Sequence, residues 1–442
     1  MAGVDRPGLT EEPAPPGDST ASRQAVAAVW RIESARIVGA LARYTGDFAM
    51  AEDLAQEALA EALVSWPRDG VPSNPAGWLM TVGRRRAIDA FRRRSALDER
   101  YAAMAAELDP GEATSGSAPP RREEDDVLYD PERIDDDVLA LVFISCHPVL
   151  SREASVALSL RVLGGLTSDE IARAFVTPTT TVQARITRAK KTLAAAHVAF
   201  EVPPPDERRE RLSAVLSVIY LIFTEGSSAT SGGEWIRTDL AREAIRQARV
   251  LARLMPTEPE TQGLLALLEL TAARFPARVR DDGTPVLLED QDRRRWDRSA
   301  IRRGRAALAS AGRVGRGLGA YGLQAAIAEC HAVAPSVEDT DWERIVLLYD
   351  ALSSLAPSPI VELNRAVAVS MARGPAAALP LVDSLVEAGD LTGSHLLPGV
   401  RGELLTRLGR TDEARSELEA AVRLCPSERE RGVLQGKLDA LA

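Results

Sequence analysis

One stretch of this sequence, residues 166–193, constrains the fold more than any other. Apolar side chains recur at helical spacing on both sides of Pro178. Because proline has no backbone N–H to donate, we expect the helical pattern to break there into two helices. Thr167 or Ser168 can cap the first helix. The apolar stripe of the second helix consists of Val182, Ile186, Ala189 and Leu193.

The opposite face of the second predicted helix is polar and basic. Its hydroxyl, amide and guanidinium groups are suited to base edges in a major groove, and the layout is typical of a helix-turn-helix. A helical hairpin with a solvated basic face has the same periodicity, so both interpretations stay open. The candidate DNA contacts on this face are Thr180, Thr181, Gln183, Arg185, Arg188 and Lys190.

Charge and cysteine content narrow the class of protein. The net charge of the 442 residues is −10, but the cations cluster in a few segments, so nucleic-acid binding is not excluded. Cys146, Cys330 and Cys425 lie far apart, and the pair Cys146–His147 lacks partners at ligand spacing. We therefore expect no metal or other cofactor. No apolar run reaches membrane-spanning length, which predicts a cytoplasmic protein without membrane contact.

A second basic segment follows Asn74, which can cap a helix beginning at Pro75. Like charges at helical spacing repel one another unless they meet an anion, and phosphates are suitable anions. Asp89 is the only acid among these arginines. The arginines expected on the exposed side are Arg84, Arg85, Arg86, Arg92, Arg93 and Arg94.

The helix predicted over residues 47–66 has an apolar and an acidic face. An acidic face is either simply solvated or a docking surface for a basic or polar partner helix. The residues expected to face inward are Leu54, Ala58, Leu59, Ala62, Leu63 and Trp66. Those expected to face outward are Glu52, Asp53, Gln56, Glu57 and Glu61.

The whole chain is predicted to be all-α. Residues 355–358 (Leu-Ala-Pro-Ser) recur as residues 424–427 (Leu-Cys-Pro-Ser), about two tetratricopeptide (TPR) units of ~34 residues further on. In this C-terminal part no nucleophile–base pair or phosphate loop stands out, so nothing there predicts enzymatic activity. The predicted domains are a disordered N-terminus (1–24), a helical bundle (25–96), an acidic flexible linker (97–137), a helix-turn-helix domain (138–200), a helical extension (206–300) and a TPR-like repeat domain (301–442).

These motifs, in this order and spacing, resemble bacterial extracytoplasmic-function (ECF) sigma factors. Residues 47–66 resemble the core-binding helix of region 2, and residues 78–94 resemble the helix that opens and holds the −10 promoter element. Residues 166–193 resemble region 4, which reads the −35 element. Four further segments resemble the ECF subgroup with a long TPR-like C-terminal extension: residues 146–150, 220–225, 288–292 and 362–369.

The resemblance implies a protein that binds core RNA polymerase, at the β′ clamp helices and the β flap, and directs it to promoter DNA. It also implies that the protein is not itself an enzyme. The implied core-binding residues are Asp53, Leu54, Gln56, Glu57 and Glu61. The implied −10 contacts are Trp66, Asn74, Trp78, Arg84, Arg85, Arg86, Asp89, Arg92 and Arg93. The six candidates of the second helix become −35 contacts. Arg86 and Gln183 depart from the family pattern, in which many members have Asn and a basic residue, respectively.

The extension is expected to regulate the sigma module, either in cis or through a protein partner in the TPR-like groove. A passive stabilising appendage is the alternative for this part. For the whole chain, the alternatives are a helix-turn-helix transcriptional regulator with a TPR sensor, acting independently of core polymerase, and a scaffold whose arginines bind acidic protein. Neither needs the segment from residue 47 to residue 94.

Overall fold

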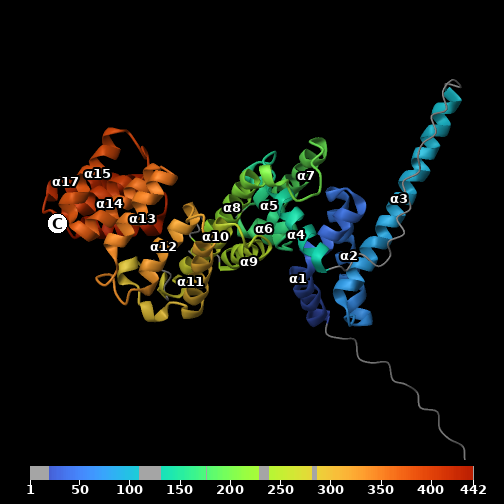
Figure 1. The fold of residues 1–442 in the computed structure, drawn as a ribbon, viewed down its shortest axis with the longest axis horizontal. Coiled ribbons are helices and arrows are strands. Elements are labelled where there is room, and N and C mark those ends of the chain that lie inside the picture. The colour runs from blue at the N-terminus through green and yellow to red at the C-terminus, as the bar shows by residue number, and fades with distance from the viewer. Residues whose placement is uncertain (1–18, 109–130, 176, 228–237, 281–285, 442) are drawn as a thin grey trace, which may run out of the picture. The chain divides into compact units, whose positions relative to one another are not determined.

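The computed structural model describes residues 19–108, 131–175, 177–227, 238–280 and 286–441. Within these ranges the regular elements are helices, as predicted, and there is no strand (Figure 1). Clustering of contacts divides the chain into two compact units. Unit 1 comprises residues 1–171 and 179–211, and unit 2 comprises residues 172–178 and 212–442. None of the described helices has the length and apolar character needed to span a membrane.

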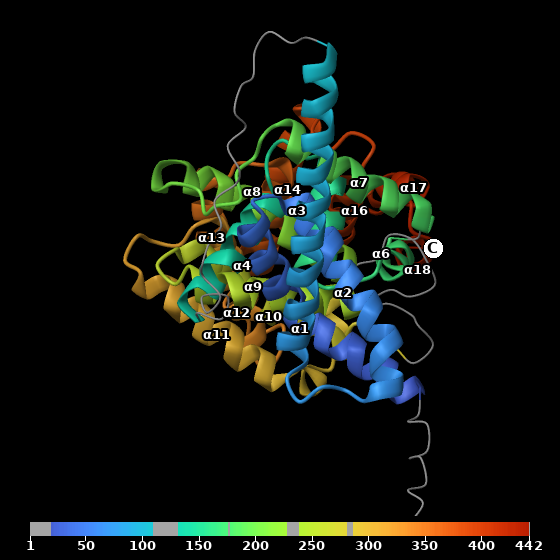
Figure 2. The same ribbon diagram turned by 90° about the vertical axis from the view of Figure 1, so that its right-hand side faces the viewer.

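The first three helices of unit 1 pack against one another as a bundle, with α1, α2 and α3 side by side (Figure 2). They are α1 (Ser19–Thr45), α2 (Phe48–Asp69) and α3 (Pro75–Leu108). Asp47 caps α2 by accepting a hydrogen bond from the Met50 amide at 3.0 Å. Burial of large apolar side chains, each contributing roughly 1.5–3 kcal/mol, holds the bundle together. Its fully buried residues include Ile37, Leu41, Trp66 and Leu79.

Four shorter helices lie between α3 and α8: α4 (Pro131–Ser145), α5 (Arg152–Val162), α6 (Ser168–Ala174) and α7 (Thr179–Ala195). All belong to unit 1 except the last three residues of α6. α4 packs on α1, and α7 packs on both α5 and α2. Thr167 and Glu170 form a capping box at the start of α6, in which Thr167 Oγ1 accepts from the Glu170 amide at 3.1 Å and Glu170 Oε2 accepts from the Thr167 amide at 2.8 Å. The predicted apolar stripe of α7 is buried.

Helices reach into segments that were expected to lack them. α1 begins at Ser19, inside the segment expected to be disordered, whose first eighteen residues lie outside the described part. α3 continues to Leu108 and α4 starts at Pro131, so both enter the expected linker, of which residues 109–130 are not described. Asp137, assigned to that linker, is buried and accepts from Arg43 Nε at 3.0 Å. Its carboxylate is therefore part of the α1–α4 interface rather than a solvated tether.

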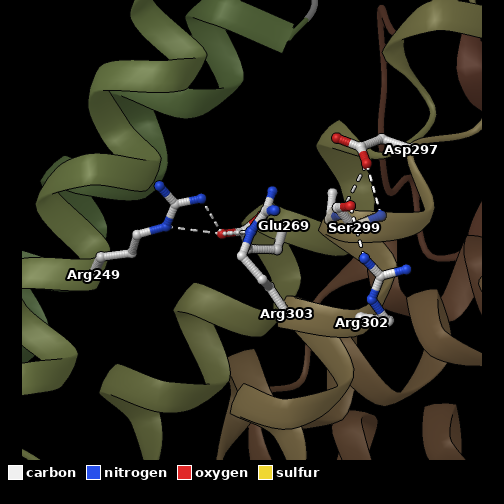
Figure 3. A network of polar contacts seen from close by, with 7 residues as sticks. Arg249, Glu269, Asp297, Ser299, Arg302 and Arg303 are labelled. Carbon is white, nitrogen blue, oxygen red and sulfur yellow. Dashed lines mark hydrogen bonds and ion pairs between the residues drawn. The ribbon is translucent and has the colours of Figure 1, made fainter.

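α8 (Pro205–Ser227) runs from unit 1 into unit 2. In the first part of unit 2, α10 (Pro259–Ala272) packs against three helices: α9 (Thr238–Leu254), α11 (Arg298–Arg313) and α12 (Ala320–Val333). Glu269 of α10 is buried and accepts from Arg249 of α9 and from Arg303 of α11 (Figure 3). A buried carboxylate is stable only when paired, so this contact joins three helices at one point.

The remaining helices of unit 2 each contact the next one along the chain. This pattern is typical of a helical solenoid, in which neighbouring pairs share a continuous core. Gly402 lies where two of the helices cross, and a Cβ atom there would come within 2.8 Å of Leu418 Cγ. The helices are α13 (Trp342–Leu355), α14 (Pro359–Arg373), α15 (Pro375–Glu387), α16 (Leu396–Arg407), α17 (Thr411–Leu424) and α18 (Glu428–Asp439).

Candidate nucleic-acid interface

The outer face of α7 presents the polar side chains expected from the sequence. Thr180, Gln183 and Arg188 are exposed, and Thr181 and Arg185 are partly buried. The turn before α7 is held by Thr179, whose Oγ1 donates to Asp169 Oδ1 of α6 at 2.8 Å. These side chains offer donors and acceptors on one side of a helix whose other side is anchored in the core, which is the arrangement a major-groove reader needs.

Lys190 differs from the other candidates on α7. The sequence pattern placed it on the exposed face, but its Nζ donates to Glu52 Oε2 at 2.7 Å and contacts Asp53 Oδ1 of α2. Burial opposes the charge of Lys190, but the neighbouring Glu52 and Asp53 carboxylates outweigh it and raise the pKa of Lys190. The placement on the exposed face was therefore wrong, because α7 packs against α2 on this side.

Glu52 is the residue that sequence reasoning missed. It was expected to face solvent, yet its side chain is only 4% exposed and accepts from Arg161 Nε of α5 at 3.1 Å as well as from Lys190. A signal was present, since Glu52 is three residues from Ala55, which is buried, and therefore borders the apolar stripe. The prediction for Leu63 was wrong in the opposite sense, because this side chain was expected to face inward and is exposed.

The arginines of α3 do not all face solvent. Arg86 donates to Glu57 Oε2 at 2.9 Å and to Glu61 Oε2 at 2.7 Å, and Arg85 donates to Glu61 Oε1 at 3.1 Å. The hydrogen bond to Glu61 is the main reason why the pKa of Arg86 is raised. The expected like-charge repulsion is thus relieved partly by acids of α2.

The rest of the α3 cluster is more open toward its C-terminal end. Arg84 lies over the ring of Tyr44, with 5.8 Å from its Cζ to the ring centroid. Arg92 and Arg93 are exposed. About four-fifths of the Arg92 side chain is accessible, and its Nη1 atom lies 3.8 Å from Asp89 Oδ1. A phosphate can therefore reach Arg92 and Arg93 without displacing an acid of α2.

Two aromatic candidates and Asn74 support the α2–α3 turn. Trp66 is buried and packs edge-on against Trp78, with 5.6 Å between ring centroids. Asn74 Oδ1 accepts from the Gly77 amide at 3.0 Å and caps α3, as the sequence predicts. Trp66 is therefore closed to a base in this conformation, whereas the loop from Gly70 to Asn74 is largely exposed.

The candidates for protein binding on α2 differ in access. The side chains of Asp53 and Glu57 are 66% and 53% exposed, whereas Leu54 is buried. Gln56 and Glu61 are partly buried. The accessible part of this face is therefore acidic. The buried Leu54 packs inside the protein and is not itself accessible to a partner.

Among the described residues, Cys146 and one group of three side chains in unit 2 have metal-ligand chemistry. Cys146 is buried, and burial raises the pKa of its thiol to about 11, which does not suit a thiolate ligand. In unit 2, one ligand atom each from His395, Cys425 and Glu430 lie within 4.8 Å of one another. Glu430 already contacts His395 at 3.4 Å, and the Cys425 thiol donates to the Ser427 carbonyl at 3.4 Å. Because these groups satisfy one another, we assign no metal to them.

Comparison with known proteins matches three parts of the chain. Residues 31–96, within α1 to α3, match Sigma-70 region 2, and residues 141–193, within α4 to α7, match Sigma-70 region 4. Residues 211–312 match a family of unknown function, DUF6596. The helices described above as candidate interfaces therefore coincide with the two sigma regions.

Two relatives extend the comparison. An uncharacterized protein of Rhizobium meliloti is 46% identical over 405 residues, which is 92% of this chain and 93% of that protein. A probable ECF RNA polymerase sigma factor, SigI, of Mycobacterium tuberculosis is 28% identical over 183 residues, which is 41% of this chain and 59% of that protein. The first relative thus shares the extension as well as the sigma regions.

Proposed function

The chain belongs to the ECF-type sigma factors with a C-terminal extension, and from this premise we propose how it engages polymerase and promoter. Region 2 binds core RNA polymerase and the −10 element, and region 4 binds the −35 element. One observation carries the proposal: the exposed polar face of α7 and the exposed arginines at residues 92 and 93 occur in one chain with the acidic face of α2.

The residue roles follow from access and charge. Thr181, Gln183 and Arg185 are proposed to read base edges, and Arg188 is proposed to bind phosphate. Arg92 and Arg93 would contribute affinity that falls with salt but little sequence information. The Asp53 and Glu57 carboxylates on α2 are the proposed contacts with the polymerase β′ clamp helices. Region 4 would in addition meet the β flap.

The pairing of Lys190 with Glu52 and Asp53 bears on this proposal. Lys190 is a candidate phosphate ligand and Asp53 a candidate polymerase contact, yet here they bind each other. Both groups would become available together when region 4 moves away from region 2. We therefore propose that promoter-competent binding separates α7 from α2, and that polymerase binding at Asp53 favours this separation.

Run-off transcription tests the sigma function. Core RNA polymerase without another specificity subunit is combined with the full-length protein and the DNA upstream of its own gene. We expect a discrete transcript with the wild-type protein and a strongly reduced one with Arg92→Ala/Arg93→Ala. Arg209→Ala, which removes an exposed cation of α8, serves as the control. A transcript that forms equally well without the protein would disprove the proposal.

A helix-turn-helix regulator with a TPR sensor is the competing function. Such a protein needs region 4 but not region 2, so the match over residues 31–96 favours the sigma factor. Co-purification separates the two, because a sigma factor competes with other specificity subunits for core polymerase. A regulator of the competing kind would bind duplex promoter DNA tightly without core enzyme.

We further propose that the extension regulates region 2 and region 4, in cis or through a protein partner. Support comes from its size and from its solenoid architecture, which offers a surface for other molecules. Promoter output in cells, compared between the full chain and a chain ending at Pro203, tests this role. The shortened chain is first checked for folding by thermal unfolding. Unchanged output would leave the extension as a passive appendage.

A further inference from the structure

A cavity of about 550 Å³ lies within unit 2, and its volume is in the range of roughly 300–1,000 Å³ typical of small-molecule sites. Three alternate helices of the solenoid, α14, α16 and α18, form one wall. These helices contribute both apolar and charged side chains to the lining. Their apolar residues there include Val367, Met371, Val400, Leu404, Val433 and Leu434. We call this space the extension cavity.

Two partly buried arginines that follow α10, Arg274 and Arg278, also line the extension cavity. Arg274 Nε donates to Gln291 Oε1 at 3.3 Å, and Arg278 Nη1 donates to the Ser227 carbonyl at 3.0 Å. Arg274 also lies over the Trp296 ring, 5.7 Å from its centroid. Across the described residues, neither guanidinium group forms an ion pair with a carboxylate.

A third guanidinium group, that of Arg407 on α16, also lines the extension cavity. It donates to Ser370 Oγ at 2.8 Å and, among described residues, has no carboxylate partner. Three acids also line the cavity: Glu403 pairs with Lys437 at 2.6 Å, Glu430 lies 3.4 Å from His395, and Glu289 is exposed. With Arg274, Arg278, Arg407 and Lys437 against these three acids, the lining carries a net charge of +1 (4 − 3) beside the apolar residues.

Several other guanidinium groups of unit 2 are paired with carboxylates, whereas Arg293 donates to the carbonyls of His331 and Ala334. Arg303 meets Glu269, and Arg401 binds both Asp383 and Glu417. Burial, together with repulsion from Arg278 and Arg293, lowers the pKa of Arg274 to about 10, so the group stays charged at neutral pH. Holding a cation away from water without an anion is unfavourable, and a bound anion would offset that cost.

We propose that the extension cavity binds a small organic anion with an apolar body. Its carboxylate or phosphate group is bound by Arg274, Arg278 and Arg407, and its apolar body lies against α14, α16 and α18. Guanidinium groups are the side chains best suited to planar or tetrahedral oxyanions. The extension of this sigma factor would then be a receptor for an amphipathic metabolite. The inference concerns unit 2 alone and does not depend on the promoter roles proposed above.

Calorimetric titration of the full-length protein tests the site with three probes of equal chain length: decanoate, decyl phosphate and decanol. We expect at least one of the two anions to bind about tenfold or more tightly than decanol, because decanol cannot form charge-assisted hydrogen bonds with the guanidinium groups. The stronger anion identifies the source of the charge as carboxylate or phosphate. Neither polymerase nor DNA is present, so the result is independent of transcription.

Variants locate the site. Arg274→Gln/Arg278→Gln and, separately, Arg407→Gln are expected to weaken anion binding about tenfold or more. Val400→Trp fills the apolar part without changing charge and should abolish binding of the same probe. Arg423→Gln is the matched control, since Arg423 is an exposed cation of the same unit outside the cavity. Thermal unfolding without ligand shows which variants fold. Arg407→Gln and Val400→Trp change α16, whereas the double variant changes the segment after α10, so the site is tested even if one of these variants fails to fold.

Three outcomes would overturn the proposal. The first is that neither anion binds, or that decanol binds equally well. The second is that the folded cavity variants bind like Arg423→Gln. The third is that a peptide of residues 109–130, which carries the acidic run Glu123–Asp126, displaces the probes and binds more tightly than either. In that case the occupant would be an acidic polypeptide rather than a small molecule.

Discussion

The Nζ atom of Lys190 lies 2.7 Å from Oε2 of Glu52, and this contact ties α7 to α2 across 138 residues of sequence. Arg161 binds the other oxygen of the same carboxylate at 3.1 Å. One buried acid therefore joins the region 2 bundle to two helices of region 4. This cluster, which we call the Glu52 cluster (Glu52, Arg161 and Lys190), leads to the first two predictions.

Lys190→Met should lower the free energy of unfolding of unit 1 by about 2 kcal/mol, because the substitution removes one of two cations from a buried carboxylate. The neighbouring Lys191→Met is the matched control: Lys191 is exposed, and its loss should change stability by less than about 0.5 kcal/mol. Urea unfolding followed by circular dichroism measures both values. Equal effects of the two substitutions would show that the Glu52 cluster contributes nothing specific.

The same contact predicts a pH dependence. The folded-state pKa of Lys190 is raised, so the contribution of its charge is fully present below the unfolded-state pKa of lysine, about 10.4, and is lost as pH rises through the folded pKa. The difference in unfolding free energy between wild type and Lys190→Met should be constant to about pH 9 and shrink above about pH 10.4. Comparing the two proteins cancels other groups that titrate there. A difference that grows with pH would contradict this assignment.

Glu61→Gln should strengthen binding to DNA. Glu61 holds both Arg85 and Arg86, so its neutralisation frees guanidinium groups for phosphates. The slope of log affinity against log salt should become steeper by about one. Glu33→Gln, which releases Arg36 on α1, removes the same charge away from α3. Fluorescence anisotropy with duplex promoter DNA at several salt concentrations measures the slopes, and identical changes in both variants would refute the role of α3.

Arg188 and Gln183 should have separable effects on binding of the −35 element. Arg188→Ala should weaken binding to all sequences alike and reduce the salt slope by about one, as expected for a phosphate contact. Gln183→Ala should leave the slope unchanged but relax the preference at one base pair, worth about 1–3 kcal/mol. Arg209→Ala is the charge control on α8. The measurement is competition binding with a set of single-base variants of the promoter.

Gly263→Ala should destabilise unit 2 by about 1–3 kcal/mol, because overpacking at a helix crossing forces the backbones apart. A Cβ atom at Gly263 of α10 would lie 2.7 Å from the Gly322 amide nitrogen of α12. Gly312→Ala is the matched control, since a Cβ atom there meets nothing within 4 Å on α11. That substitution should stabilise the helix by roughly 0.5–1 kcal/mol. Thermal unfolding measures both variants. Stabilisation of both would show that α10 and α12 do not cross closely at Gly263.

Local sequence patterns determined the helices and most of their inner faces. The stripe Val182, Ile186, Ala189 and Leu193 is buried as predicted, because a periodicity of 3.6 residues is a property of one helix by itself. The cap at Asn74 was also predictable, since a capping side chain acts on an amide only three residues away. The all-helical architecture follows from the same short-range rules.

Only the tertiary structure decided which charged groups meet. Glu52 and Lys190 look like solvated residues in their own helices, and it is the packing of α7 on α2 that buries them as a pair. Three guanidinium groups of the extension cavity have no carboxylate partner in the described part of the chain, and they likewise come from two segments separated by more than a hundred residues. Electrostatic energy depends on distance and burial in space, and neither can be obtained from the spacing of residues along a single helix.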